Sequence, residues 1–316
     1  MYPLGEKLPV WAIVVGDDRF PEWVPYGALD LKAVPVQYCR LTALASPFQR
    51  AVHLAAAIAS VSRVLVTALP EHRARWEPYT WFVRPSMRFI NEGNAASRIA
   101  LAAAILSVAD RSPSNVLAII PARSHVVHEF ILRDALKQMV ARLPEVPEGV
   151  ASLGMIDMDD SVDEDYLVLQ RSSGGQGLNV SGIARRPTAW VARHLRRQGA
   201  VVASGILVGY AGAFAAHLSK HWPGVTAKLT RLSQGATEAK QECIVPSTVG
   251  LGVPSTVRHC LRWDPPLFKQ RVFTVSQCGW SGLKSPHAVA RIADFVSKEE
   301  TYRRQHLDPE NRFEHA

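Results

Sequence analysis

The chain has 316 residues, of which 47% are hydrophobic, and its lysines and arginines exceed its aspartates and glutamates by 36 − 28 = 8. This composition argues against a disordered chain and provides for a full-sized core. The basic balance favours anionic partners such as nucleotides, sugar phosphates or nucleic acid. The basic residues are spread along the chain rather than gathered in one arm, so a soluble protein that is merely basic is an equal alternative.

The cysteines and the apolar runs bear on the compartment. None of the cysteines has CxxC spacing, which favours reduced thiols of a cytoplasmic protein over a zinc site or a disulfide framework; they are Cys39, Cys243, Cys260 and Cys278. The first apolar run, 10–16, is short and ends in acidic residues, so no secretory signal is expected. The segment 201–218 is long enough to raise a membrane helix, but its glycines split it into a strand and a helix start.

The first half of the chain alternates between strands and helices. Ser46, Pro47 and Gln49 have the pattern of a capping box at a helix start. The other helices are an Ala-rich one before the turn at 112–115, a short one at 71–76 and a long one at about 126–143. Strands are predicted at 10–15, 63–69, 80–84, 116–121 and 149–156. This rhythm predicts right-handed crossovers and a doubly wound sheet.

The strand at 116–121 organises this half. It is apolar at every position before its closing proline, which is typical of a parallel strand covered on both faces. The polar loop that follows lies at the carboxyl end of the strand. In such folds the ligands bind at that end, so we expect the loop at 121–125 to contribute to a site.

The rhythm changes after residue 156. An acidic run at 157–165 leads into two strands that read as an antiparallel excursion from the sheet. The remaining elements are strands at 166–170, 179–183 and 271–276, a strand and helix within 201–218, and helices at 187–198, 225–239 and 286–298. We expect one domain over 1–300, with a core at 10–156, and a frayed tail at 301–316.

Three local patterns have bland interpretations that we prefer. The glycine-rich loop at 171–177 lies between antiparallel strands, so it predicts a hairpin rather than a phosphate loop. The acidic run at 157–165 has the alternate spacing of a calcium loop but lacks its glycine and closing glutamate, which favours a solvated loop. His125 and His128 have no third ligand in register, which favours a helix-capping or surface role over zinc.

Several segments together carry a family resemblance. The chain resembles the sugar-1-phosphate nucleotidyltransferases, most closely the mannose-1-phosphate guanylyltransferase branch, from about Trp11 to Val296. The segments that carry it are IVVGDDRFP at 13–21, AVPVQYCRL at 33–41, Asn94-Ala95-Ala96, IIPARSH at 119–125, ASLGMI at 151–156, IARRP at 183–187, VASGI at 202–206 and CGWSGL at 278–283. The resemblance implies an α/β fold with a doubly wound, mostly parallel, Rossmann-like sheet, in which 157–300 forms the sugar-side half.

The same resemblance implies an activity, and the departures from it bear on that activity. Members of the family transfer a nucleoside monophosphate from a nucleoside triphosphate to a sugar phosphate, with a divalent metal neutralising the developing charge. The departures concern residues that would contact phosphate, sugar or metal. Asp17 and Asp18 stand where phosphates would arrive, Val36 replaces a lysine, Arg123-Ser124 replaces a metal-binding aspartate, Arg185-Arg186 replaces Glu-Lys, Ala203 replaces an asparagine, and Gly282 replaces the second metal-binding aspartate.

Magnesium requires carboxylate or phosphate oxygens, and an arginine at its site opposes it. We therefore hypothesise an accessory or regulatory protein of polysaccharide biosynthesis that binds a nucleotide or sugar nucleotide without metal or other cofactor. The resemblance assigns nucleotide binding to Gly16, Arg19, Asn94 and Arg123, and sugar or phosphate binding to Arg186, Ser204 and Gly205. An equal alternative is that these arginines lie at a surface that binds no ligand.

Two alternatives stay open. One is an active nucleotidyltransferase with displaced metal ligands from 157–165, for which magnesium would be required. The other is a structural or dimerisation subunit that binds no small molecule. A homodimer or an active relative is the protein partner we consider, and a nucleic-acid binder is disfavoured because no basic stripe is interleaved with aromatic residues.

Overall fold

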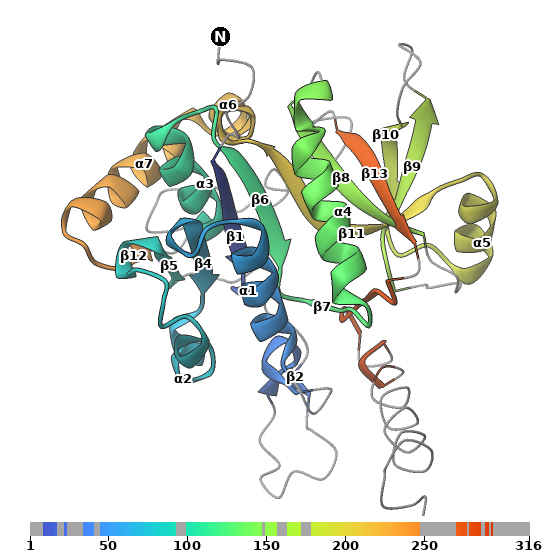
Figure 1. Ribbon diagram of the computed structural model, residues 1–316, viewed down its shortest axis with the longest axis horizontal. Coiled ribbons are helices and arrows are strands. Elements are labelled where there is room, and N and C mark those ends of the chain that lie inside the picture. The colour runs from blue at the N-terminus through green and yellow to red at the C-terminus, as the bar shows by residue number, and fades with distance from the viewer. Residues whose placement is uncertain are drawn as a thin grey trace, which may run out of the picture.

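The computed structural model describes residues 9–17, 22–23, 34–40, 45–92, 99–146, 149–156, 163–171, 178–246, 270–276, 278–285, 288–290 and 292. Their strands form one large mixed sheet with helices on both sides (Figure 1). The sheet order is β12-β5-β4-β1-β6-β11-β8-β13-β10-β9.

The large sheet contains β1 (Val10–Val15), β4 (Val64–Ala68), β5 (Arg88–Asn91), β6 (Val116–Pro121), β8 (Val150–Ile156), β9 (Tyr166–Arg171), β10 (Leu178–Ala184), β11 (Val201–Tyr210), β12 (Cys243–Val245) and β13 (Arg271–Ser276). Two short pairs lie outside it, β2 (Glu22–Trp23) with β3 (Val34–Pro35) and β7 (Ser124–His125) with β14 (Ser281–Gly282). The helices are α1 (Pro47–Ile58), α2 (Arg73–Trp76), α3 (Ile99–Arg111), α4 (Glu129–Ala141), α5 (Ala189–Arg197), α6 (Ala211–His221) and α7 (Pro223–Glu238).

The strands β12, β5, β4, β1 and β6 are parallel to one another. From β1 the chain passes through α1 to β4 on one side, and from β5 it passes through α3 to β6 on the other side of β1. Because both crossovers are right-handed in such sheets, the two helices lie on opposite faces. Helix α1 packs with α4, whereas α3 packs with α6 and α7. The predicted doubly wound α/β fold is confirmed.

The second half of the sheet closes on itself. Strand β11 runs antiparallel to both β6 and β8, β8 is parallel to β13, and β13 continues through β10 to β9. Strand β9 then pairs with the start of β11, at Val201 and Val202. The five strands β8, β13, β10, β9 and β11 therefore form a closed ring, which occupies the right-hand part of Figure 1. The predicted antiparallel excursion is present and is one side of this ring.

Most predicted elements are present, but the strand predicted at 80–84 is wrong. Residues 80–84 form turns, and the strand β5 begins at Arg88, after a short 3-10 helix that contains Pro85. The side chain of Arg88 donates to the carbonyls of Thr80 and Val83 at 2.9 and 3.1 Å, which holds the turn. Trp81 is 79% exposed, whereas Phe82 and Val83 pack against the core from the turn, so the segment contributes apolar side chains without forming a strand.

The segment 201–218 divides as its glycines predicted, into β11 and the start of α6. Among the residues that the structure describes, helices long and apolar enough to cross a membrane do not occur. The predicted helix at 286–298 lies mostly outside the described residues, and so do the loop at 172–177, the start of the acidic run and the tail at 301–316.

The predicted capping box at α1 is confirmed. The backbone N–H of Gln49 donates to Oγ of Ser46 at 3.3 Å, and the backbone N–H of Ser46 donates to Oε1 of Gln49 at 2.8 Å. Pro47 occupies the first helical turn. The capping box thus fixes where α1 begins. From there the helix packs over β1 and β6, next to the loop that follows β6.

Replacing Ser46 with alanine is expected to lower the free energy of unfolding by about 1 kcal/mol, because the backbone N–H of Gln49 loses its acceptor, the Ser46 hydroxyl. Ser60 precedes a short 3-10 helix without a side-chain cap, so Ser60→Ala is the matched control and should change stability little. Urea unfolding followed by circular dichroism measures both variants. Equal midpoints for the two would contradict the role of the capping box.

Candidate functional site

The carboxyl ends of the parallel strands carry a buried polar cluster. Asp17 follows β1, is 1% exposed, and accepts hydrogen bonds from the hydroxyl of Thr67 on β4 and from Nδ2 of Asn91 on β5, the latter at 3.0 Å. The hydroxyl of Tyr38 donates to the carbonyl of Gly16 at 3.2 Å. Burial and then the charge of Asp17 raise the pKa of Tyr38. Asp17 therefore faces its own donors rather than a phosphate.

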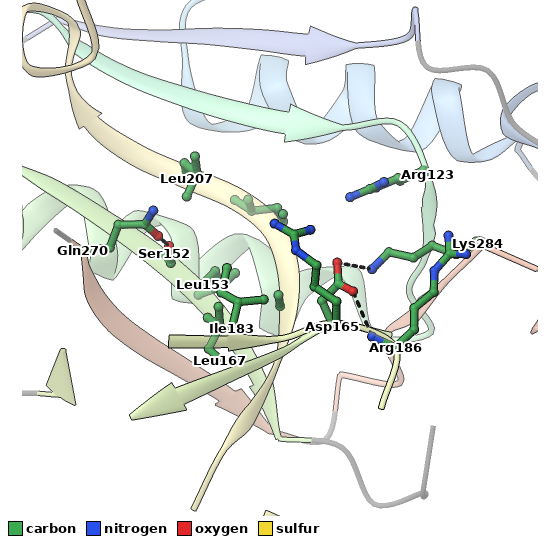
Figure 2. A pocket seen from close by; sticks show the side chains of 14 residues that line it. Arg123, Ser152, Leu153, Asp165, Leu167, Ile183, Arg186, Leu207, Gln270 and Lys284 are labelled. Atoms are coloured by element: carbon green, nitrogen blue, oxygen red, sulfur yellow. Dashed lines mark hydrogen bonds and ion pairs between the residues drawn. The ribbon is translucent and has the colours of Figure 1, made fainter. Parts of the chain in front are cut away.

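A cavity of about 540 Å³ opens beside the loop after β6, within the ring of strands. Its walls are mostly apolar side chains from β8 to β11. These are Leu153, Leu167, Ile183, Ala203, Ile206 and Leu207 (Figure 2). At one end the hydroxyl of Ser152 donates to Oε1 of Gln270, and both residues are buried. This end therefore offers neutral polar groups to a ligand.

The opposite end of the cavity is basic. Among the residues that the structure describes, Arg123, Arg185, Arg186 and Lys284 line it, against one lining carboxylate, that of Asp165. Figure 2 shows Arg123 and Lys284 on one side of this end and Arg186 below them. Guanidinium and ammonium groups form strong charge-assisted hydrogen bonds with phosphate oxygens. The arrangement suits a ligand with an anionic group at one end and neutral polar groups at the other.

Two distant segments meet at the basic end. Ser124 and His125 pair with Gly282 and Ser281 through β7 and β14, and the backbone N–H of Leu283 donates to the carbonyl of Arg123 at 3.0 Å. Thus Arg123 and Lys284, which are 161 positions apart (284 − 123), are held on neighbouring backbones.

The end of the acidic run folds into the same region. Oδ2 of Asp163 accepts from the hydroxyl of Ser285 at 2.7 Å. Glu164 is 3% exposed, and its Oε2 lies 2.8 Å from Nζ of Lys284. Asp165 accepts from the same Nζ at 3.4 Å and from the backbone N–H of Arg186 at 3.2 Å. These three carboxylates are packed against partners, so the expectation of a solvated loop does not hold for them.

Burial raises the pKa of Glu164, and the nearby charges of Lys284 and Arg123 oppose that rise. The distance between Nζ of Lys284 and Oε2 of Glu164 is that of an ion pair. Nζ of Lys284 also donates a hydrogen bond to Oδ2 of Asp165. The ammonium group thus lies between the two carboxylates.

Gly282 is packed directly against Glu164. A Cβ at Gly282 would lie 2.7 Å from Cδ of Glu164 and would overlap Oε1. A Cβ atom does not come this close to an atom to which it is not bonded, so a side chain at this position would displace the carboxylate. The missing side chain of Gly282 and the position of Glu164 are therefore two parts of one arrangement.

Gly282→Ala is expected to lower the free energy of unfolding by about 1–3 kcal/mol, because the added methyl overpacks a buried ion pair. Gly235 in α7 has open space where a Cβ would stand, so Gly235→Ala should be neutral or stabilising by up to about 1 kcal/mol. Guanidinium unfolding followed by tryptophan fluorescence compares them. A Gly282→Ala protein as stable as the unmodified chain would show that Glu164 has room to move.

The predicted site residues separate into three groups. Arg123, Arg186 and Gly205 line the cavity. Gly16 and Ser204 do not: a Cβ at Gly16 would overlap Phe48, and the Ser204 hydroxyl donates to the carbonyl of Leu153 at 2.6 Å and accepts from the N–H of Ile206 at 3.0 Å. Arg19 and Asn94 lie outside the described residues.

Gly205 lies at an irregularity in β11 and makes room for the side chain of Arg123. Its φ is +78°, in the region that favours glycine, and β11 departs from regular register with β8 between Ala203 and Leu207. A Cβ at Gly205 would stand 3.1 Å from Pro121 and 3.4 Å from Nη2 of Arg123. The irregularity in β11 therefore gives Arg123 its space at the cavity.

Sequence reasoning missed Glu164, Lys284, Ser152 and Gln270 as site residues. The acidic run at 157–165 contains several carboxylates, and its pattern does not indicate which of them turns inward. Lys284 follows the GWSG segment and could have been paired with the run, because a buried carboxylate needs a cation. Ser152 and Gln270 belong to no motif or pattern that would mark them in the sequence as residues of a site.

Comparisons with known proteins address the fold. No family model matches the chain, and no curated protein matches it. Among solved structures, mannose-1-phosphate geranyltransferase from Thermus thermophilus superposes with a TM-score of 0.65 at 20% identity, covering 90% of this chain and 79% of that one. The chain has the fold of the sugar-1-phosphate nucleotidyltransferases. The fold resemblance that the sequence motifs carried is confirmed.

Two further structures share this nucleotidyltransferase fold. Mannose-6-phosphate isomerase from Helicobacter pylori superposes with a TM-score of 0.56 at 15% identity, covering 87% of this chain and 100% of that one. CMP:2-keto-3-deoxy-manno-octonic acid synthetase, solved in complex with CTP, gives 0.51 at 11% identity, covering 92% and 99%. At these identities the likeness concerns the fold alone.

The resemblance to the sugar-1-phosphate nucleotidyltransferases implies a magnesium ion, and the described residues at the corresponding positions do not fit one. The two positions where the sequence lacks metal-binding aspartates carry Arg123 and Gly282, and they lie side by side through β7 and β14. Of the described carboxylates, Glu164 lies against Gly282, and Glu164 and Asp165 both hold the ammonium of Lys284. Within the described part of the chain, His, Cys, Asp and Glu side chains do not gather in threes that could hold a metal ion.

Proposed function

We propose that the chain binds a nucleotide sugar, or another nucleotide with a terminal phosphate group, in the cavity beside β6, without a divalent metal. Its role is that of an accessory or regulatory protein beside an active relative in the cytoplasm. The observation that carries this proposal is the basic end of the cavity, where, among the described lining residues, four cationic side chains outnumber one carboxylate.

The chemistry of the cavity supports this ligand class. Its volume of about 540 Å³ falls within the usual range of small-molecule sites. Phosphate oxygens bind at Arg123 and Lys284, and Arg185 and Arg186 cover them from the exposed side. Sugar hydroxyls reach the neutral polar end at Ser152 and Gln270, across the apolar walls.

The test is calorimetric titration of the full chain with GTP, GDP-mannose and mannose 1-phosphate, each with magnesium and with a chelator. Saturable binding that survives the chelator supports the proposal. Binding of none of the three ligands under either condition overturns it.

A catalytic readout distinguishes the proposal from an active transferase. Glu164 and Asp165 bring carboxylates into the site, which is where displaced metal ligands of an active enzyme would stand. The full chain is therefore incubated with GTP, mannose 1-phosphate and magnesium, and pyrophosphate is measured. Magnesium-dependent release of pyrophosphate would replace the proposed function with nucleotidyl transfer.

A further inference from the structure

We propose that the ammonium group of Lys284 occupies the place of a divalent cation, so that the site carries a built-in positive charge and is closed to metal. The inference rests on the proposed function for the identity of the anion, although its first test does not. It assigns to Lys284 two tasks, which are to hold the carboxylates of Glu164 and Asp165 and, beside Arg123, to receive a phosphate group.

The geometry around Nζ of Lys284 is that of a cation site. Oε2 of Glu164 lies 2.8 Å away and Oδ2 of Asp165 lies 3.4 Å away. The side chains of Lys284 and Glu164 are 7% and 4% exposed. Figure 2 shows the lysine reaching Asp165 at the basic end of the cavity, which Lys284 and Asp165 both line. The Glu164 carboxylate is buried and that of Asp165 is partly exposed, at 25%. A buried carboxylate requires a cation, and here the chain supplies it.

The backbone holds this lysine in place from both sides. Leu283 is bonded through its N–H to the carbonyl of Arg123, and Ser285 donates its hydroxyl to Asp163. The Ser285 hydroxyl also accepts from the N–H of Ala288 at 3.1 Å. Lys284 is thus fixed between two tied residues, which reduces the entropy lost when a ligand binds.

The carboxylates of Glu164 and Asp165 are both held in place independently of Lys284. Glu164 fills the space that a side chain at Gly282 would take. Asp165 is held by the backbone N–H of Arg186 through its second oxygen. Neither carboxylate needs to move for a cation to lie between them, so removal of the ammonium leaves two oxygen ligands in position. Manganese and magnesium bind such oxygen ligands and complete their coordination with water.

The first test measures metal directly. The full chain, Lys284→Ala and the double variant Lys284→Ala/Glu164→Gln are titrated with Mn²⁺, and bound ion is measured by electron paramagnetic resonance. We expect Lys284→Ala to bind one Mn²⁺ saturably. The unmodified chain, which keeps the ammonium, and the double variant, which lacks the Glu164 carboxylate, should each bind Mn²⁺ roughly tenfold more weakly or worse. Lys284→Met, which keeps the apolar stem, replaces Lys284→Ala if the latter does not fold.

Two results of this test would overturn the inference. One is Mn²⁺ binding by the unmodified chain as tight as that of the variant. The other is a folded Lys284→Met or Lys284→Ala protein that binds no Mn²⁺. Either result would make Lys284 an ordinary ion-pair lysine.

The second test measures the anion. In chelator, Lys284→Ala should bind GDP-mannose roughly tenfold more weakly than the unmodified chain, and magnesium should restore part of the loss, because the metal re-supplies the charge. The exposed Lys220 on α6 provides the matched control, and Lys220→Ala should bind as the unmodified chain does.

The two tests separate the two proposals. If the unmodified chain binds no nucleotide, sugar nucleotide or sugar phosphate, the proposed function fails, and the Mn²⁺ titration still decides the role of Lys284. If GDP-mannose binds equally well to Lys284→Ala in chelator, the proposed function stands and the inference fails.

Discussion

Asp17→Ala is expected to lower the free energy of unfolding by about 3 kcal/mol, because it leaves two buried donors without their acceptor. Asp17 is 1% exposed and accepts from the Thr67 hydroxyl and from Nδ2 of Asn91. These residues stand at the ends of three neighbouring parallel strands, so the carboxylate joins β1, β4 and β5 where no backbone ladder continues. Alanine supplies no oxygen and leaves a small cavity.

Denaturant unfolding measured by circular dichroism and tryptophan fluorescence tests this prediction. Asp110 is exposed at the end of α3 and accepts only from the exposed side chain of Gln234 among the contacts described, so Asp110→Ala should change stability by less than about 0.5 kcal/mol. If the two alanine variants unfold at the same denaturant concentration, the cluster at the strand ends does not stabilise the fold.

The second large effect concerns binding. Arg123→Gln is expected to weaken binding of GDP-mannose by about 10- to 100-fold, because a charge-assisted hydrogen bond to phosphate contributes about 1.5–3 kcal/mol. Arg123 lines the basic end, beside Lys284, on the loop after β6. Glutamine keeps a donor and much of the length but loses the charge, so the variant tests electrostatics rather than packing.

Calorimetric titration in low and moderate salt measures this loss, and the difference between the variants should shrink as salt rises. Arg231 is an exposed arginine of α7, away from the cavity lining, and Arg231→Gln provides the matched control. Equal affinities for Arg123→Gln and Arg231→Gln would show that the phosphate binds elsewhere.

The fold was largely predictable because its signals are local. Periodicity and turn residues located β1, β6, β11 and the start of α1, and in each case the pattern depends on neighbours in the chain. The strand at 80–84 was mispredicted because its apolar residues serve a turn that Arg88 holds, in which Val83 is buried and Trp81 is exposed. Composition alone cannot distinguish an exposed aromatic run from a strand.

The site was only partly predictable because it is assembled from distant segments. Arg123 and Arg186 were found because the family motifs place charged residues there. The partnership of Glu164 with Lys284 and Gly282 was not found, since it depends on the pairing of β7 with β14 and on the direction in which the acidic run turns. Conversely, Gly16 and Ser204 match the motifs, but their groups are used in packing and backbone bonds.

The closed ring of strands makes the walls of the cavity rigid before a ligand binds. Each of β8, β13, β10, β9 and β11 has a hydrogen-bonded neighbour on both sides, so the walls of the cavity cannot part without breaking ladders. Strands in such ladders exchange their amide protons only through costly openings. A ligand therefore meets a wall that is already in its final form, and the entropy lost on binding falls mainly on the ligand and on the arginine side chains at the exposed end.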